Sequence, residues 1–429
     1  MTHPTWYTPV IVVAFTVIAW LIFSEAPSPD LRASWIAGHF YALGATDMIY
    51  AGNEGYFSML PADGWQDWSD AHGLEGPTYP FVYPPLWAAV ASWAVPHVPY
   101  EIAKGVANVV NPALMAGMVW LAARCVDDRD VSVPMMTLVG CAFCIATLPG
   151  MVALAQNQPH ILVAFLLVFA IERDRAGAPV AAGAALALAA SLKLFPAIFV
   201  LLWIARGHWR PVAAFAVAGA ALGGLSVLLA GWPLHRAFLD EIDAIRSTAM
   251  ITHFTYGIDA ILSGAAWPEA MMQVSDGSGK GWYVVQKPPL WQMASSIALA
   301  TVLVLGVLAV RTAATAGRSP DVLIWPMLFI GVAFVSPLAW GYYYLPALAF
   351  LPHLLDRFGL RRGLLAMVAL ALPITPAGFS ILSQADLLLS LPALTGAAIM
   401  LICAGLFALA IRRRRTAAGG PLRATPVSL

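Results

Sequence analysis

The sequence contains very little charge. Charged residues make up 11% of its 429 residues, hydrophobic residues make up 60%, and the formal net charge is zero. A soluble domain of this length could not cover so much apolar surface with polar side chains, so the composition indicates an integral membrane protein. The balanced charge gives no indication of nucleic-acid binding, which normally needs a basic surface.

Cysteine is also scarce, and acidic pairs suited to a metal are missing. The CxxC pair at 141–144 has no second pair that could complete a zinc site, and all four cysteines fall in or at the ends of apolar segments. We therefore expect them to be buried thiols. No closely spaced carboxylate pair occurs near the candidate site described below, and we expect no metal and no other cofactor.

Long apolar runs dominate the chain. A membrane-spanning helix needs about 20 mostly apolar residues. The block at 178–206 is too long for one span and predicts two short helices that meet at 191–196. We predict an all-α integral membrane bundle of about 12 transmembrane helices, with residues 1–411 as one domain. Besides the block, the spans lie near 6–24, 99–123, 131–150, 158–171, 210–230, 290–310, 321–337, 342–355, 363–379 and 389–411.

The basic residues are concentrated on one side of these spans. Of 23 Lys and Arg residues, 16 fall in alternate connectors and the tail at 412–429, whereas acidic residues divide seven to 16 in the opposite sense. Cytoplasmic loops carry the excess of Lys and Arg, so both termini are predicted to be cytoplasmic. Two long segments, 25–98 and 231–289, then lie on the outer side, the first of them as a large loop.

Three polar features stand out on this outer side. Lys193 lies inside an apolar block, where an ionisable group usually faces a wet cavity, although it could also snorkel to the headgroups. Gln156 and Asn157 could hydrogen-bond sugar hydroxyls or cap the following helix. Asp30 follows Ser-Pro directly after the first span, where it could be catalytic or could simply be the N-cap of a helix that starts at residue 31.

An ordered set of motifs resembles glycosyltransferase family 87, a membrane family of the GT-C superfamily. The resemblance covers residues from about 25 to 355. Its opening motifs are Asp30 to Gly38, Gly44, Ile49-Tyr50 and Tyr83-Pro84-Pro85-Leu86, and its later motifs are Gln156-Asn157, Ala189 to Pro196, Arg206 to Arg210, and Ser336 to Trp340.

The resemblance implies an enzyme class and a catalytic residue. Members of the family transfer a sugar, typically mannose, from a polyprenyl-phosphate donor, and their catalytic aspartate lies in the first extracytoplasmic loop. Here that residue would be Asp30, acting as the base that deprotonates an acceptor hydroxyl. A single base without a covalent intermediate implies inversion. The acceptor would be a lipid or a glycan, at the periplasmic face of a bacterial inner membrane.

The other candidate residues are placed around this reaction. Lys193 would neutralise the leaving phosphate, with possible help from His253, although a single outer-loop histidine is often incidental. Asp47 is the reserve candidate for the base. Contacts with the sugar or the acceptor are assigned to amide and aromatic side chains: Tyr83, Gln156, Asn157 and Trp340.

Two other functions fit part of this pattern. About twelve spans with an intramembrane lysine also describe transporters and flippases, although we detect no repeat between the two halves and the polar groups converge on one face. A transferase for another lipid-linked sugar, such as arabinose or glucose, fits equally well. Family members often carry histidine shortly after the Ser-Pro-x-x-Trp motif, whereas this chain has Gly341 followed by three tyrosines.

Overall fold

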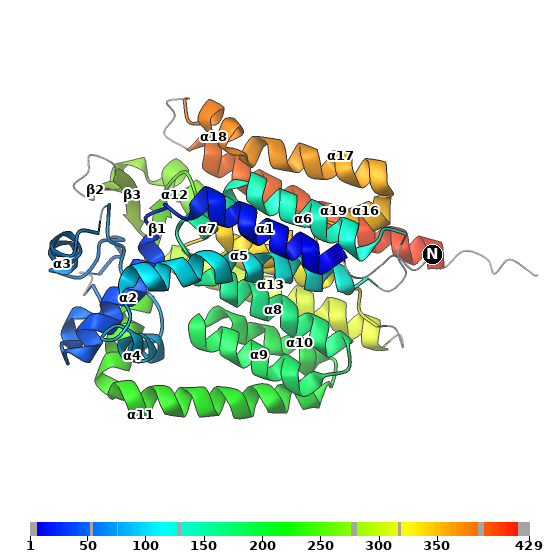
Figure 1. The fold of residues 1–429 in the computed structure, drawn as a ribbon. Helices are drawn as coiled ribbons and strands as arrows, with labels where there is room; N and C mark the ends of the chain where they lie inside the picture. The colour runs from blue at the N-terminus through cyan, green and yellow to red at the C-terminus, as the bar shows by residue number, and fades with distance from the viewer. Residues whose placement is uncertain are drawn as a thin grey trace, which may run out of the picture.

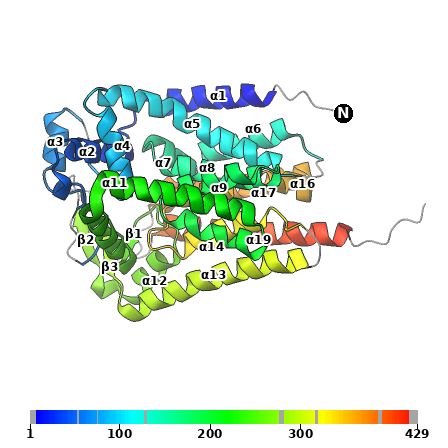
Figure 2. The same cartoon turned by 90° about the horizontal axis from the view of Figure 1, so that it is seen from below.

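The computed structural model describes residues 7–51, 55–74, 76–126, 130–275, 281–315, 319–384 and 390–418. Most of them are helical, and the long helices run along one bundle (Figures 1 and 2). Apolar helices occur in most of the predicted spans, with bounds that differ from the prediction in several of them. They are α1 (Tyr7–Phe23), α5 (Tyr100–Arg124), α6 (Val133–Ala146), α7 (Leu148–Ala155), α8 (His160–Arg175), α9 (Pro179–Leu192), α10 (Val200–Ala205), α11 (Trp209–Ser247), α13 (Pro289–Thr315), α14 (Ile324–Phe334), α17 (Leu360–Ala371) and α19 (Leu391–Ala418).

The number of complete membrane spans is smaller than the sequence predicts. Within the described ranges, four helices are long and apolar enough to cross a membrane: α5, α11, α13 and α19. The count rises to six if two bent pairs each form one span, α6 with α7 and the 360–374 segment with α18 (Pro376–Leu382). Several other predicted spans are short or broken helices. The predicted span at 342–355, for example, divides into η4 (Gly341–Tyr344), α15 (Leu345–Leu348) and part of α16 (His353–Phe358). The figure of about 12 is therefore not confirmed.

The predicted break inside 178–206 is present. Helix α9 ends at Leu192, Lys193 is extended, and the chain resumes helical structure in η2 (Phe195–Phe199) and then α10. Pro196 lies in the first turn of η2, a position that proline tolerates, whereas it would disrupt a continuous helix. The break places Lys193 between two short helices, not within one.

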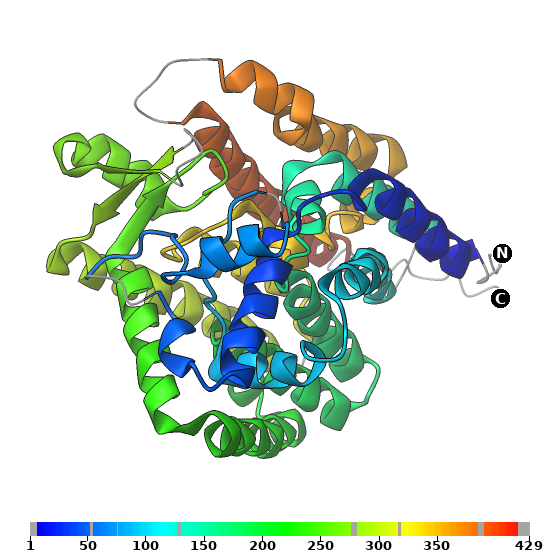
Figure 3. The same ribbon diagram turned by 60° about the vertical axis from the view of Figure 1, so that its left-hand side comes forward.

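The first long segment forms a compact layer at one end of the bundle (Figure 3). It contains α2 (Pro29–Ala42), η1 (Thr46–Met48), α3 (Trp65–Ala71) and α4 (Pro85–Ala94). Helices α2 and α4 approach so closely at Gly38 that a Cβ atom there would lie 2.7 Å from the Cβ of Ala91. Buried Ile36, Trp65 and Phe81 share a core with Phe238 of α11, which fixes this layer on the bundle.

The second long segment contains a small sheet, so the all-α prediction is wrong there. Helix α11 continues past a kink at Gly231 (φ 70°) to Ser247 and leads into the sheet. The antiparallel strand order is β1 (Thr248–Ile251), β3 (Gly281–Gln286), β2 (Met272–Ser275), and α12 (Ile258–Ala266) and η3 (Pro268–Ala270) lie between β1 and β2. The aromatic and β-branched run in β3 is typical of a strand, but hydropathy alone does not distinguish it from a loop.

The opposite end of the bundle carries the basic connectors. Ion pairs join them there: Arg124 to Glu172 at 3.0 Å, Arg206 to Asp174 at 3.1 Å and Arg357 to Asp321 at 3.3 Å. The start of α1 and the end of α19 lie at this end too (Figure 1). The predicted grouping of these connectors on one side is therefore present. Of the predicted tail at 412–429, the described residues reach 418 and continue α19; the rest lies outside the described residues.

Candidate active site

Asp30 lies where two cavities meet, at the end of the bundle that carries α2 and the sheet. The apolar cavity, of about 350 Å³, is lined mainly by aliphatic and aromatic side chains and also by Lys193. The polar cavity, of about 930 Å³, is lined by hydroxyl, amide and aromatic side chains and includes Gln156. Four residues line both cavities: Asp30, Met59, Trp340 and Tyr342.

The backbone directly before the helix that carries Asp30 is strained. The helix begins at Pro29, so Asp30 lies inside its first turn and is not the N-cap that the alternative interpretation required. Ser28, the residue before the helix, has a φ of 53°. Positive φ is unfavourable for residues with a Cβ and is typically maintained by the surrounding structure at functional sites. In the described residues the other non-glycine examples are Met59, which lines both cavities, and Asn157.

Asn157 connects the start of the Asp30 helix to the bundle through hydrogen bonds. Its side-chain amide donates to Ser28 Oγ at 2.8 Å and to Asn108 Oδ1 at 2.6 Å, and its Oδ1 accepts from Asn111 at 2.9 Å. Asn157 is buried, and it is absent from the described lining of both cavities. This placement favours a positioning role for Asn157 over the direct substrate contact that was predicted from its sequence.

The two glutamines on either side of Asn157 face different cavities. Gln156 lines the polar cavity, whereas Gln158 lines the apolar cavity. The Gln158 Oε1 atom accepts a hydrogen bond of 2.7 Å from the Tyr83 hydroxyl. Gln158 was not among the residues predicted from the sequence, although it belongs to the same polar run between two apolar helices, and that run was the available signal.

Lys193 lies in a cage of tyrosine rings beside Asp30. Its Nζ atom is 4.6 Å from the ring centre of Tyr343, 5.4 Å from that of Tyr83 and 5.7 Å from that of Tyr342. Aromatic faces attract a cation, and they do so most strongly where water is excluded. In the described part of the chain Lys193 forms no direct ion pair with Asp30. Its ammonium group is therefore held by aromatic rings and interacts with the Asp30 charge without direct contact.

Burial raises the pKa of Asp30 to about 7, and the nearby Lys193 charge and a hydrogen bond with Gln158 oppose this rise. Removing a carboxylate from water disfavours its ionised form, which is the larger effect here. A carboxyl group with a pKa close to neutral can accept a proton at physiological pH and release it again, as a general base must.

The remaining predicted residues divide between the site and the surface. Tyr83 lines the apolar cavity and Trp340 lines both. His253 lines the polar cavity, where its Nδ1 atom lies 2.8 Å from Ser390 Oγ. Asp47 is exposed on η1 and is not among the described lining residues of either cavity, so the geometry does not favour it as the base.

Tyrosines replace the histidine that the family often carries after the Ser-Pro-x-x-Trp motif. Tyr342 and Tyr343 belong to η4 and contribute to the cage around Lys193. Sequence reasoning noted the replacement but did not place these rings at the lysine. No group of three or more His, Cys, Asp or Glu side chains in the described residues could hold a metal ion. The absence of a cofactor stays a prediction.

Comparison with known proteins agrees with the resemblance seen in the sequence. Residues 81–339 match the sequence model of glycosyltransferase family 87. The match spans more than half of the chain, and the chain belongs to this family. It includes Tyr83, Gln156, Lys193 and His253, whereas Asp30 precedes it.

The chain also shows a low similarity to a solved structure. The crystal structure of ArnT from Cupriavidus metallidurans bound to undecaprenyl phosphate is 15% identical, with a TM-score of 0.34. The alignment covers 95% of this chain and 78% of that chain. No curated protein matches the sequence.

Proposed function

We propose that this family member is an inverting glycosyltransferase that moves a sugar, with mannose as the expected sugar, from a polyprenyl-phosphate donor to a lipid or glycan acceptor. The reaction takes place at the periplasmic face of a bacterial inner membrane, with both termini in the cytoplasm. One observation carries the proposal: Asp30 lies where an apolar cavity containing a lysine meets a separate polar cavity. A reaction between a lipid-linked donor and a hydroxylic acceptor needs this arrangement.

The apolar cavity suits the donor. Leu299 of α13 lines it, together with Ile242 and Ile245 from the part of α11 that follows the kink at Gly231, and α13 is apolar enough to cross a membrane. Figure 2 shows that α13 runs along the bundle from the end that carries the sheet. A polyprenyl chain can therefore lie against these aliphatic side chains while its phosphate meets Lys193. A positioned cation in a dry site stabilises the charge that develops on the leaving phosphate.

The reaction is one displacement at the anomeric carbon. Asp30 takes the proton of the acceptor hydroxyl while that oxygen forms a bond to the anomeric carbon. The bond from this carbon to the phosphate oxygen breaks, and polyprenyl phosphate leaves with the electron pair. Attack on the face opposite the leaving group inverts the configuration, so a β-linked donor gives an α-linked product.

Membership of a transferase family argues against the transporter alternative. The described polar residues of the site also gather at one end of the bundle, whereas a transporter must expose its binding site to both sides in turn. The choice of mannose as the donor sugar rests on the family resemblance alone. The test below therefore includes other lipid-linked sugars.

The test is sugar transfer by the purified protein in liposomes. Radiolabelled polyprenyl-phosphate mannose is supplied with membrane extract as the acceptor source, and the wild type is compared with Asp30→Asn and Asp47→Asn. We expect product from the wild type and from Asp47→Asn, and almost none from Asp30→Asn. If polyprenyl-phosphate glucose or arabinose is used and the mannose donor is not, the assignment of the donor sugar changes and the reaction class stays. A folded wild type that uses none of the three donors would refute the proposal.

A further inference from the structure

The lining of the polar cavity has the chemistry of a saccharide site. Six aromatic rings contribute to it, from Tyr79, Phe254, Trp282, Tyr283, Trp340 and Tyr342. The Trp282 ring is fixed by a hydrogen bond of 2.9 Å from its Nε1 atom to the Ser58 carbonyl oxygen. Rigid aromatic faces bind the apolar faces of sugar rings with little loss of conformational entropy. Hydroxyl, amide and imidazole groups lie among them, from Gln156, Thr252, His253 and Ser390.

One of these groups lacks a protein partner. The Oε1 atom of Gln156 is buried, and no described residue donates a hydrogen bond to it. A buried acceptor that is left unpaired loses the hydrogen bond it would make with water, which is unfavourable. Gln156 precedes the clamped Asn157, so the amide is held at the wall of the cavity. A ligand hydroxyl would supply the missing donor.

The charges in the cavity favour a neutral ligand. Asp30 is the one carboxylate of the described lining, and no lysine or arginine is found among those residues. A phosphate or a uronic acid would meet this carboxylate, and Lys193, beside Asp30, lines the apolar cavity and not this one. The volume of about 930 Å³ lies near the upper end of the range for ligand pockets and leaves room for more than one sugar ring.

The route into the polar cavity differs from the route into the apolar one. Its described lining includes no residue of α11 or α13, whereas both helices line the apolar cavity. It is formed instead by the segments around Met59 and Tyr79, the chain from 250 to 254, and β3. The ligand therefore enters from the aqueous side, beside the sheet visible in Figure 3.

We propose that the polar cavity binds the acceptor as a neutral saccharide of two or more rings, with Gln156 and Trp282 as specificity-determining residues. This inference rests on the proposed function, because it names the class of acceptor that Asp30 deprotonates. The saccharide can be free or can be the headgroup of a glycolipid; the chemistry of recognition is the same.

The test is saccharide binding measured without catalysis. The full chain is placed in phospholipid nanodiscs, because many detergents carry sugar headgroups that would compete. Binding of mannotriose, maltotriose and the corresponding monosaccharides is followed by saturation-transfer difference NMR, with and without polyprenyl phosphate in the bilayer. We expect saturable binding of at least one trisaccharide and weaker binding of its monosaccharide. Gln156→Leu should weaken trisaccharide binding about tenfold, as expected for one lost hydrogen bond.

Matched variants control for folding. Gln273→Leu alters an exposed glutamine of β2 outside the cavity, and Trp93→Ala removes an exposed tryptophan of α4; neither should change binding, in contrast to Gln156→Leu and Trp282→Ala. If Trp282→Ala does not fold, Gln156→Leu alone decides. A chemically identical saccharide attached to a lipid distinguishes a glycolipid headgroup from a free glycan.

The outcomes separate this inference from the proposed function. If the protein still transfers sugar from the donor but binds neither free nor lipid-attached saccharides in a saturable way, the inference is overturned and the proposed function stands. Binding that survives in both cavity variants places the saccharide elsewhere and also overturns it. If the cavity variants lose saccharide binding but the wild type transfers sugar from no polyprenyl-phosphate donor, the saccharide site is supported and the transferase function is refuted.

Discussion

Two buried aspartates, Asp30 and Asp259, each lie near a lysine at the same end of the molecule. The environments of the two pairs differ: Lys287 is buried, whereas Lys193 is half-buried. Asp259 of α12 forms a direct ion pair of 2.7 Å with Lys287, and its other oxygen accepts hydrogen bonds from Trp291 and Ser295 of α13. Asp30 makes no such ion pair with Lys193 in the described residues; both groups open onto cavities. A closed network stabilises structure, whereas an open pair leaves its charges available to a substrate.

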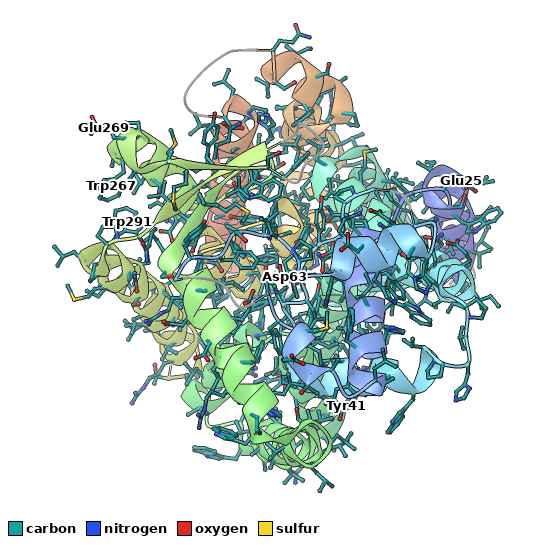
Figure 4. All side chains as sticks on the ribbon, turned by 90° about the vertical axis from the view of Figure 1, so that its left-hand side faces the viewer. Glu25, Tyr41, Asp63, Trp267, Glu269 and Trp291 are labelled. Carbon is teal, nitrogen blue, oxygen red and sulfur yellow. The ribbon has the colours of Figure 1, made fainter. Side chains whose placement is uncertain are left out.

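The closed pair joins α12 to the start of α13. Trp291 also packs against Trp267, with ring centres 5.4 Å apart, at the edge of the end shown in Figure 4. Lys287 also lines the apolar cavity, but its charge is already neutralised by Asp259. Proximity to a cavity is therefore not enough to identify a catalytic lysine; the partners of its ammonium group decide.

The same substitution in the two aspartates should give opposite results. Asp30→Asn removes the base and should reduce kcat about 10²- to 10⁴-fold, with a melting temperature close to that of the wild type. Asp259→Asn leaves Lys287 buried without its counter-charge and should lower stability by about 3–5 kcal/mol. Transfer assays and thermal unfolding of both variants check this. A strongly destabilised Asp30→Asn protein would remove the distinction between the pairs.

Removal of both charges sharpens the comparison. The double variant Asp259→Asn with Lys287→Met should recover much of the lost stability, since a buried ion pair can be replaced with little net loss while a single unpaired charge cannot. Asp30→Asn with Lys193→Met should recover no activity, because both groups act on the substrate. The measurements are thermal unfolding for the first pair and transfer for the second. Restored transfer in the second double variant would contradict the proposed roles.

Lys193→Met should weaken the donor site specifically. Loss of one preorganised charge at a reacting group typically reduces the rate about 10²- to 10³-fold, and kcat/KM for the donor should fall in this range. Donor binding should weaken as well, as measured by titration with polyprenyl phosphate. Lys287→Met serves as the control for a nearby lysine, after its transfer rate is corrected for the folded fraction. Equal losses from both variants would argue against a special role for Lys193.

The pH dependence of the reaction tests the open environment of Asp30. Its pKa is raised to about 7, and only the ionised carboxylate can accept the proton. Activity should therefore be high above pH 7 and should decrease as the pH falls through 7, approaching a tenfold loss per unit at lower pH. A profile of kcat/KM between pH 5 and 9 measures this. A rate that stays constant down to pH 5 would mean that no group with this pKa acts as the base.

Tyr83→Phe should have the smallest effect. It keeps the ring beside Lys193 but removes the hydrogen bond of 2.7 Å to Gln158. One such bond contributes about 0.5–1.5 kcal/mol, so transfer should fall by no more than about tenfold. Tyr83→Leu also removes the ring and should lose more. Equal activity of the two variants would show that the ring contributes nothing to the site.

Local properties were predictable from the sequence. The positions of most apolar helices and the break at Lys193 follow from hydropathy and from Pro196, which act over a few neighbouring residues. The number of spans and the sheet were not predicted correctly. An apolar run does not reveal whether it continues straight, bends between α6 and α7 by 71°, or ends as a short helix, because packing against distant segments decides this.

The sequence by itself determined that this is a membrane protein, that it belongs to a glycosyltransferase family, and that Asp30, Gln156 and Lys193 are unusual in their surroundings. Only the tertiary structure decided that Asp30 faces two cavities, that Asn157 is hydrogen-bonded to Ser28 and that Gln158 and two tyrosines lie beside Asp30 and Lys193. The physical reason is distance along the chain. Residues 30, 158, 193 and 342 meet through the packing of separate helices, and no local pattern records which helices will be neighbours.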